Sequence, residues 1–249
     1  MNEWLDDFKM AVAFLTRLPV PHPGAANFAR AYRLFPVVGG LIGLAMGVFC
    51  LALRQVGVPD LAAAAVVLGA GALLTGALHE DGLADVADGF GGGRDRAAKL
   101  EIMRDSRLGT YGALILLVSF AAKLSALAAV PDGYVVPGLI AAHALGRGIL
   151  PAMSLNLPYA RKDGLARNAG QPDAPTAAIA GGLALLIALL SLSWSNALFA
   201  AVLAGLSGLA IAWLALRQIG GQTGDVLGGA EQVAETAILV MLAARLALS

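Results

Sequence analysis

Charged residues are scarce in this chain of 249 residues, where they make up 14%, whereas soluble domains usually carry about 25%. The basic and acidic residues balance at 17 each, so the chain lacks the basic excess that nucleic-acid binding requires. Cysteine occurs once, at Cys50, and a single cysteine excludes a disulfide framework within the chain. These deficits argue against a soluble domain, a nucleic-acid-binding protein and a disulfide-stabilised fold.

Hydrophobic residues are abundant instead, at 58% of the chain, and the mean hydropathy is +0.76. They gather in seven apolar runs, most of which approach the roughly 20 residues that a helix needs to cross a bilayer. The runs are rich in alanine, leucine and glycine, and they lie near 34–54, 59–79, 110–130, 135–157, 176–194, 196–216 and 232–248. We therefore predict an all-α fold, a polytopic integral membrane helical bundle of about seven transmembrane helices that forms one domain over residues 1–249.

The residues before the first run predict an amphipathic helix that lies in the membrane interface. Glu3, Asp6 and Asp7 stand where a signal peptide would carry positive charge. Apolar residues recur there at helical spacing, namely Trp4, Leu5, Phe8, Ala11, Val12, Leu15 and Leu18. The proline-rich stretch at 19–23 is expected to end this helix, because proline breaks helical hydrogen bonding.

Glycine spacing and the placement of basic residues refine the expected bundle. Gly39, Gly43 and Gly47 form a stripe of small residues on one face of the first run, which predicts close packing against a neighbouring helix. With seven spans, the N-terminal segment and the connections at 80–109, 158–175 and 217–231 fall on one side of the membrane. These segments hold most of the 17 basic residues, so the positive-inside rule places that side in the cytoplasm.

Three aspartates open the 80–109 connection at a spacing that places them on one helix face. Asp81, Asp85 and Asp88 follow the pattern i, i+4, i+7, with no lysine interleaved. Carboxylates gathered in this way repel one another unless cations neutralise them. Mg²⁺ takes carboxylate oxygens and often shares them with substrate phosphates. The pattern therefore predicts a magnesium site for phosphate chemistry, with a solvated acidic helix end as the plainer alternative.

Two arginines lie further along the same connection. Arg104 and Arg107 are expected to clamp phosphate oxygens, since guanidinium donors match phosphate geometry. Asp105, between them, is expected to be a further metal ligand or to orient an arginine. The alternative for the arginines is a positive flank that serves membrane topology alone.

A glycine-rich segment at 220–229 precedes the last run. Glycine lets backbone N–H groups approach an anion, and a helix is expected to begin just after this segment. Asp225, Glu231 and Glu235 add acids on the same side of the membrane. The segment is thus a second phosphate or metal site, or a turn that only connects helices.

Three titratable residues fall inside predicted spans. Lys123 lies in one run, while His143 and Arg147 lie four residues apart on one face of another. Charges within a span are costly and usually face an internal cavity. The alternative is that these side chains reach from near a helix end to the membrane surface.

These segments together resemble the cobalamin 5′-phosphate synthase family, the adenosylcobinamide-GDP ribazoletransferases of bacteria and archaea. The resemblance rests on two cytoplasmic motifs, HEDGLADVADG at 79–89 and EIMRDSRLGTYG at 101–112. Supporting matches keep the expected order along nearly the whole chain, and they are TRLPVP at 16–21, FPVVGG at 35–40, YAR at 159–161 and GGQTGD at 220–225.

The resemblance implies an Mg²⁺-dependent enzyme that joins α-ribazole, or its 5′-phosphate, to adenosylcobinamide-GDP and releases GMP. This reaction lies late in cobalamin (vitamin B12) biosynthesis. The resemblance also implies a multi-pass protein of the bacterial cytoplasmic (inner) membrane, with its active site on the cytoplasmic side. The expected partners are the two small-molecule substrates and the lipid bilayer, without nucleic acid, and the oligomeric state stays open, a homo-oligomer included.

Motifs and resemblance together assign a site. The predicted catalytic residues are Asp81, Asp85, Asp88 and Asp105. The predicted metal ligands are Asp81, Asp85, Asp88 and Glu231. The predicted substrate-binding residues are His79, Arg104, Arg107, Lys123, Arg147, Gly221, Thr223 and Asp225. The sequence does not decide whether Asp105, Asp225 or Glu231 completes the metal shell or takes the proton.

Two alternatives remain at this point. The aspartates are distantly similar to the acidic motif of CDP-alcohol phosphotransferases, which make phospholipid head groups. That motif has Ala-Arg where this chain has Ala84-Asp85, and its later Gly-x-x-x-Asp-x-x-x-Asp is missing here. A transporter that uses Lys123, His143 and Arg147 would have polar sites near the membrane midplane and broken helices.

Overall fold

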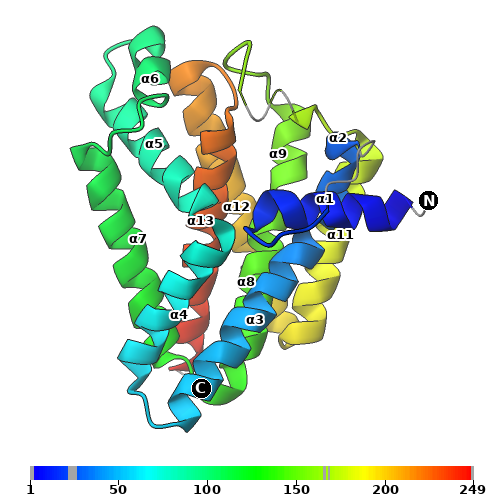
Figure 1. Ribbon diagram of the computed structural model, residues 1–249, viewed down its shortest axis with the longest axis vertical. Coiled ribbons are helices and arrows are strands. Elements are labelled where there is room, and N and C mark those ends of the chain that lie inside the picture. Colours follow the sequence, from blue (N-terminus) through cyan, green and yellow to red (C-terminus); the bar gives the residue numbers. More distant parts are fainter. Residues whose placement is uncertain (1–2, 22–26, 165–166, 168, 248–249) are drawn as a thin grey trace.

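The computed structural model describes residues 3–21, 27–164, 167 and 169–247, so the proline-rich stretch at 19–23 lies partly outside the described residues. The N-terminal elements are α1 (Glu3–Leu15), α2 (Phe28–Ala31) and the 3₁₀ helix η1 (Tyr32–Leu34). The remaining helices are α3 (Phe35–Gln55), α4 (Asp60–Thr75), α5 (Leu78–Gly92), α6 (Arg96–Ile102), α7 (Thr110–Ala129), α8 (Asp132–Gly148), α9 (Leu150–Asn156), α11 (Ala174–Ser191), α12 (Trp194–Ile219) and α13 (Gly224–Leu246). The long helices run roughly along one axis, which is vertical in Figure 1.

Polar side chains and glycine mark several helix ends. Asp95, Asp173 and Thr223 cap α6, α11 and α13 by accepting a backbone N–H from three residues further on, at 2.9, 2.9 and 3.2 Å. Gly220 ends α12 with a φ of 76°, a left-handed conformation that suits glycine. These signals cut the apolar sequence into separate helices.

Among the described residues, six stretches are long and apolar enough to cross a membrane, and the pair α4 and α5 makes a seventh if it counts as one bent span. The six are Phe28–Gln55, Thr110–Ala129, Asp132–Asn156, Ala174–Ser191, Trp194–Ile219 and Gly224–Leu246. The predicted all-α membrane bundle of about seven helices is thereby confirmed.

The predicted start of the last span, at 232, is wrong. The helix α13 begins at Gly224, and α12 continues to Ile219, so little of the expected connection at 217–231 is a loop. The polar residues of 217–231 predicted a connection, because charge inside a helix bundle is costly. Glu231 is nevertheless fully buried, and this is tolerated because the guanidinium of Arg147 lies 2.5 Å from its carboxylate and neutralises it.

The glycine stripe of α3 packs directly against α8, as predicted. A Cβ on Gly39 would lie 2.4 Å from the backbone oxygen of His143, and one on Gly43 would lie 2.3 Å from that of Leu139. A Cβ on Gly47 would come within 2.7 Å of the backbone of Val136. The two helices therefore approach more closely than any side chain would allow.

A sharp bend separates α4 from α5. The two helix axes meet at 91°, and the bend is made by two consecutive left-handed residues, Gly76 with φ 68° and Ala77 with φ 54°. The N-terminal segment supports this bend, because the backbone N–H of Arg17 donates to the carbonyl of Leu74 at 2.7 Å. The bend turns α5 away from the direction of α4 and presents the first turn of α5 to α13.

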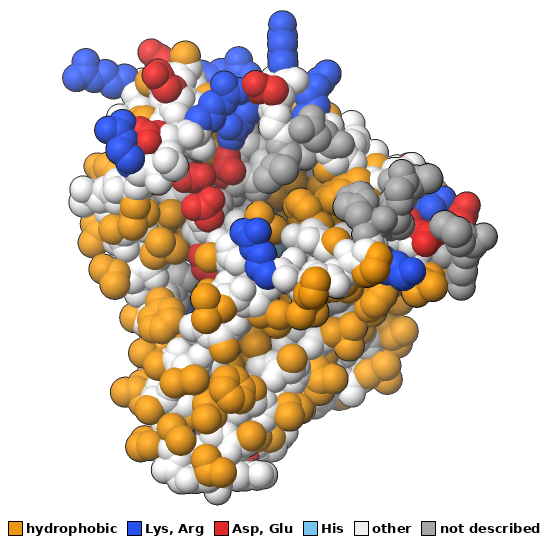
Figure 2. Space-filling view, in the orientation of Figure 1, with side chains coloured by type: hydrophobic (Ala, Val, Ile, Leu, Met, Phe, Trp, Pro, Cys, Tyr) orange, Lys and Arg blue, Asp and Glu red, His pale blue; other side chains and the backbone are white. Residues whose placement is uncertain are grey.

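Charged side chains gather at the end of the molecule that carries α5 and α6, while hydrophobic side chains cover most of the opposite end (Figure 2). The connections between α7 and α5, between α9 and α11, and between α12 and α13 all lie at this charged end (Figure 1). The three connections that were predicted to lie on one side of the membrane thus lie at one end of the fold.

The N-terminal helix forms as predicted and runs crosswise to the long helices (Figure 1). Its one fully buried acid, Asp7, anchors it through Arg30 at 2.9 Å and Arg33 at 2.7 Å. Trp4 and Leu5 stay exposed on α1, and its location in the membrane interface stays a prediction.

Candidate active site

The close crossing of α5 and α13 brings two acidic segments together. A Cβ on Gly82 would lie 2.9 Å from the carbonyl oxygen of Asp225, and one on Gly228 would lie 3.2 Å from the Cα of His79. These glycines therefore allow the first turns of the two helices to touch backbone to backbone. The helical spacing predicted for the three aspartates is confirmed, because all of them lie on α5.

Asp81, Asp85 and Asp225 form the acidic part of the site. His79, Asp81 and Asp225 line a hollow of about 90 Å³ between the two helices. The charged groups that act most strongly on Asp85 are Asp225, Asp81 and Arg161. Within the described residues, the carboxylates of Asp81 and Asp85 accept no hydrogen bond, so their oxygens are available for a ligand.

One arginine balances part of this negative charge. Arg161 donates from Nη2 to Oδ2 of Asp225, and the hydroxyl of Thr223 donates to the same oxygen at 3.1 Å. Arg161, Thr223 and Asp225 line a second hollow of about 220 Å³, which Tyr159 and Arg167 also border. Asp225 therefore belongs to both hollows and links them.

Asp88 has different surroundings from the other two aspartates of α5. Its two carboxylate oxygens accept the backbone N–H groups of Gly109 and Gly112, both at 2.8 Å. A Cβ on either glycine would lie within 2.4 Å of this carboxylate, so glycine is required at both positions. Asp88 thus holds the first turn of α7, where the helix dipole also favours an anion, and its predicted role as a metal ligand stays a prediction.

The second motif lies at the surface beside Asp88. Asp88, Asp105 and Arg107 line an open hollow of about 430 Å³. Arg107 donates from Nε to Oδ1 of Asp105 at 3.0 Å and from Nη2 to Oδ2 at 2.5 Å, and these hydrogen bonds hold the pKa of the Asp105 carboxyl below its usual value. Arg104 pairs instead with Asp163, on the connection between α9 and α11. Both arginines are exposed, and their predicted role as a phosphate clamp stays a prediction.

Glu231 lies in the interior of the bundle, away from solvent. Its oxygens contact Nη1 of Arg147 at 2.5 Å, Nδ1 of His79 at 3.2 Å and the amide of Gln232 at 3.0 Å. These groups already satisfy the carboxylate, and its predicted role as a metal ligand stays a prediction. His79 connects this interior group to the hollow that holds Asp81.

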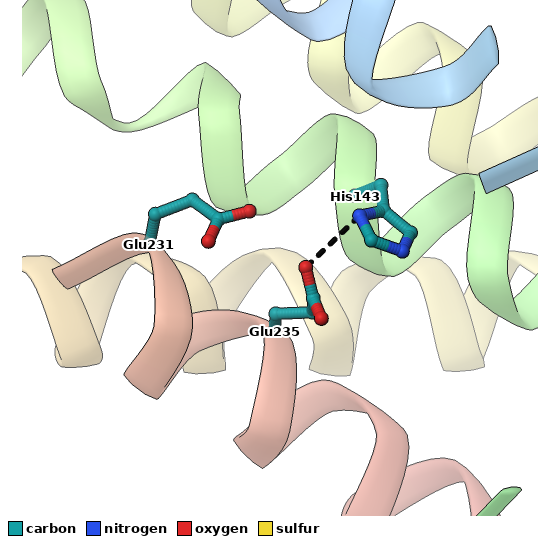
Figure 3. A group of neighbouring side chains, drawn as sticks. All are labelled: His143, Glu231 and Glu235. Atoms are coloured by element: carbon teal, nitrogen blue, oxygen red, sulfur yellow. Dashed lines mark ion pairs between the residues drawn. The ribbon is translucent and has the colours of Figure 1, made fainter. Parts of the chain in front are cut away.

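A second buried carboxylate lies one turn further along α13. Glu235 contacts Nδ1 of His143 at 2.9 Å and Nζ of Lys123 at 3.2 Å, and Lys123 also donates to Gln232 at 2.7 Å. Figure 3 shows His143 reaching from α8 toward Glu235 on α13, with Glu231 beside it. We call the residues Lys123, His143, Arg147, Glu231, Gln232 and Glu235 the buried polar network.

Gly221 serves the packing of two loops. A Cβ there would lie 2.1 Å from the carbonyl oxygen of Pro158. The neighbouring Gln222 pairs its backbone with the 158–160 segment at 2.8 and 2.9 Å, and its side-chain amide donates to the carbonyls of Ser154 and Leu157. This pairing positions Arg161 beside Asp225.

The structure therefore separates the predicted site residues other than Gly221 into three groups. Asp81, Asp85, His79, Thr223 and Asp225 gather where α5 crosses α13. A second group consists of Asp88, Asp105 and Arg107 around the start of α7, with Arg104 near it. The third group lies in the interior and holds Lys123, Arg147 and Glu231.

Sequence reasoning gave Arg161 no place in the site, although it is the arginine paired with Asp225. Its position in YAR at 159–161 marked only the family resemblance, since no spacing links it to an acid 64 residues away. Gln232 was missed for a similar reason, because a glutamine inside an apolar run carries no charge signal.

Comparisons with known proteins agree over most of the chain. A model of the cobalamin-5-phosphate synthase family matches residues 7–243. A protein of Bradyrhizobium diazoefficiens is 48% identical over 242 residues, which cover 96% of this chain and 93% of that protein. Proteins of Sinorhizobium medicae and Mesorhizobium japonicum are 44% and 45% identical and cover 98% and 95% of this chain, and 98% and 92% of their own lengths. All three relatives are named adenosylcobinamide-GDP ribazoletransferase, and no solved structure matches the chain.

Proposed function

This chain belongs to the cobalamin-5-phosphate synthase family, and we propose that it acts as an adenosylcobinamide-GDP ribazoletransferase. The family match confirms the resemblance drawn from the two motifs, and the relatives' name is that of an enzyme of cobalamin synthesis. That name favours the transferase over both alternatives, the phospholipid synthase and the transporter.

In the proposed reaction a hydroxyl oxygen of α-ribazole, or of its 5′-phosphate, attacks the phosphorus nearer to cobinamide in adenosylcobinamide-GDP. A new phosphorus–oxygen bond forms while the bond from that phosphorus to the bridging oxygen breaks. The products are adenosylcobalamin, or its 5′-phosphate, and GMP, and the hydroxyl proton is released. Positioning and charge neutralisation supply most of the rate in such transfers, and no covalent nucleophile is needed.

The observation that carries this proposal is the group of acids at the crossing of α5 and α13. Asp81, Asp85 and Asp225 lie within electrostatic reach of one another, with Arg161 beside them. A pyrophosphate would be repelled by these acids alone, so the site requires added positive charge.

The donor set fits Mg²⁺. The oxygens of Asp81 and Asp85 have no hydrogen-bond donor among the described residues, and carboxylate oxygens are the protein ligands that Mg²⁺ prefers. We assign Asp81 and Asp85 as its ligands, with Asp225 as the third acid within reach. When bound, the ion lowers the pKa of a hydroxyl and offsets charge on the departing phosphate.

The chain's own groups complete the proposed site. Arg161 orients Asp225 and, as a forked donor, matches a phosphate oxygen in the hollow that both residues line. Asp88 positions the start of α7, where the second motif ends. Arg104 and Arg107 remain the proposed clamp for the GDP part of the substrate, from the exposed rim of the site.

We further propose that the charged end faces the cytoplasm of a bacterial inner membrane. The connections that hold most basic residues lie at this end (Figure 1), where Lys and Arg side chains gather (Figure 2), and basic residues are retained on the cytoplasmic side. This orientation places the acids of α5 where a nucleotide-activated substrate and Mg²⁺ are both present.

The direct test incubates the purified protein with adenosylcobinamide-GDP, α-ribazole and Mg²⁺, with GMP and the corrinoid product measured together. We expect equal amounts of the two products, and loss of both when EDTA removes the metal. GMP without a new corrinoid would indicate hydrolysis, and product formation that is insensitive to EDTA would overturn the magnesium assignment. Replacement of α-ribazole by a phospholipid alcohol acceptor tests the phospholipid alternative, for which no product is expected.

A further inference from the structure

A cavity of about 240 Å³ lies in the membrane part of the bundle, next to the buried polar network. One wall is apolar and includes Met46, Leu68 and Phe120, while Lys123 and His143 form the polar end. Gly69 and Phe120, on α4 and α7, are exposed at its rim, so the cavity opens between these helices toward the lipid-facing surface. The proposed reaction at the acids of α5 makes no use of this space.

Two polar groups at this cavity have unused hydrogen-bonding capacity. The ammonium of Lys123 has three N–H donors, and among the described residues only Gln232 and Glu235 accept from it. Nε2 of His143 is buried and has no hydrogen-bond partner in the part of the chain that the structure describes, and Figure 3 shows it pointing away from both glutamates. A buried polar atom without a partner destabilises the protein, so a ligand with a matching polar atom is favoured here.

A metal ion does not fit this place. Ligand atoms of His143, Glu231 and Glu235 lie within 4.8 Å of one another, as in a metal centre. Both carboxylates, however, are already neutralised, Glu231 by Arg147 at 2.5 Å and Glu235 by Lys123 at 3.2 Å. A divalent cation would have to displace these two fixed positive charges.

The size of the cavity restricts the ligand further. Pockets for drug-sized ligands measure about 300–1,000 Å³, so about 240 Å³ admits a flat ring system but neither a corrin nor a whole nucleotide. The apolar wall suits the faces of such a ring, and the free N–H of Lys123 suits an unprotonated ring nitrogen. The chemistry is therefore that of a neutral heteroaromatic base.

The cavity is also adjacent to the acids. Glu80 lines it, while the next residue, Asp81, lines the hollow between α5 and α13. A nucleoside whose base occupies the cavity would thus have its ribose at the first turn of α5. Resting on the proposed function, we propose that this intramembrane cavity binds the aromatic base of the lower-ligand nucleoside, with Lys123 donating to its ring nitrogen.

The test fills the cavity without disturbing the packing. A Cβ on Gly69 meets no atom within 4 Å, and the same is true of Gly182 on α11, which borders no part of the cavity. Gly69→Leu should raise KM for α-ribazole by about tenfold or more while KM for adenosylcobinamide-GDP stays unchanged, because pockets exclude extra methylene groups to this extent. The matched control Gly182→Leu should leave both KM values at the wild-type level.

A second pair of variants tests the apolar wall of the cavity instead of its volume. Phe120 and Phe49 are 42% and 41% exposed, but only Phe120 borders the cavity. Phe120→Ala should raise KM for α-ribazole and leave KM for adenosylcobinamide-GDP unchanged, whereas Phe49→Ala should change neither. This pair keeps the proposal testable if Gly69→Leu does not accumulate in the membrane.

The outcomes separate this proposal from the proposed function. An active wild-type enzyme whose KM for α-ribazole is unaffected by Gly69→Leu and Phe120→Ala overturns the base site alone. Equal increases in both KM values, or an equal effect of the control variants, would overturn it as well. A wild-type protein that forms no corrinoid product from the two substrates would overturn the proposed function, and the base site with it.

Discussion

At the scale of single residues, surroundings rather than residue type distinguish the acids of α5. Asp85 and Asp88 are three positions apart, yet Asp88 has two backbone N–H groups on its oxygens at 2.8 Å while Asp85 has mainly other acids around it. The Asp88 carboxylate, which already accepts two backbone N–H groups, positions the start of α7. The Asp85 carboxylate, which has other acids around it, requires a cation to offset the repulsion.

Asp85→Asn tests the assignment of the metal. The substitution keeps the size of the side chain and removes its charge, so Mg²⁺ binding should weaken. We expect GMP release to fall at least a hundredfold, which corresponds to about 3 kcal/mol of transition-state stabilisation. Turnover measured over a range of Mg²⁺ concentrations checks this, and wild-type turnover with an unchanged Mg²⁺ dependence would contradict Asp85 as a ligand.

Asp88→Ala tests whether Asp88 positions the start of α7. Removal of the side chain leaves the N–H groups of Gly109 and Gly112 without acceptors at the start of α7. Loss of a comparable helix cap costs about 0.5–2 kcal/mol, so the melting temperature in detergent should fall. Asp85→Ala is the matched control and should leave the melting temperature unchanged or raised, because it relieves repulsion. A stable Asp88→Ala protein would refute the capping role.

Arg107→Lys and Arg104→Lys test the phosphate clamp. Lysine keeps the charge but loses the forked donor geometry, so at least one of the two variants should lower kcat/KM for adenosylcobinamide-GDP. Arg94 is exposed on the same charged end, and Arg94→Lys is expected to be silent. Wild-type kinetics in both test variants, with normal membrane insertion, would show that the two arginines serve membrane topology alone. Arg161 and the start of α13 would then be the next candidates for the phosphate site.

At the scale of elements, close helix crossings set the geometry of the site. Small residues allow α3 to pack on α8 and α5 to cross α13, and the first crossing holds the helix that carries His143 and Arg147. In lipid, such contacts replace the hydrophobic driving force that water supplies to soluble proteins. The polar network is therefore positioned by packing that lies outside it.

Gly43→Ala should destabilise the protein, because the new Cβ would lie 2.3 Å from a backbone oxygen of α8. Backbone cannot move aside as a flexible side chain does, and such overpacking costs about 1–3 kcal/mol. Gly181→Ala on α11 is the control, since its Cβ meets no atom within 4 Å. Thermal unfolding of the two variants in one detergent makes the comparison, and equal melting temperatures would mean that the α3–α8 contact is looser than the structure shows.

At the scale of the whole molecule, charge is polarised along the bundle axis. The charged end holds the acids of α5, the second motif and the 158–175 connection, whereas the described part of the opposite end is mainly apolar (Figure 2). Arg54 at that end is paired with Asp60 at 3.2 Å and Asp132 at 2.8 Å, so it adds little net charge there. This polarity predicts one orientation in the membrane.

Single cysteines at positions 94 and 162 should react with a membrane-impermeant thiol reagent only when the cytoplasmic face is accessible. A cysteine at position 133, at the opposite end, should react only from the other face. All three positions are exposed, and the native Cys50 is buried and should stay unlabelled. Labelling of positions 94 and 162 from opposite faces would refute the arrangement of seven spans.

Much of the architecture follows from the sequence itself. Hydropathy over about 20 residues fixes which segments enter the membrane, because an apolar segment of that length satisfies all of its backbone hydrogen bonds within itself when it forms a helix. The stripe of Gly39, Gly43 and Gly47 predicted a close contact, since the absence of a side chain is visible without coordinates. The spacing of Asp81, Asp85 and Asp88 likewise predicted a helix that carries acids.

Which polar residues pair with one another was decided by tertiary structure alone. Neither the pairing of Arg161 with Asp225, nor that of Glu231 with Arg147, has a sequence signal, since each joins helices or loops far apart in the chain. For the same reason, the start of α13 was misplaced, because only its partners make Glu231 acceptable inside the bundle. Periodicity and hydropathy are local properties of a chain, whereas the environment of a charge depends on which distant segments surround it.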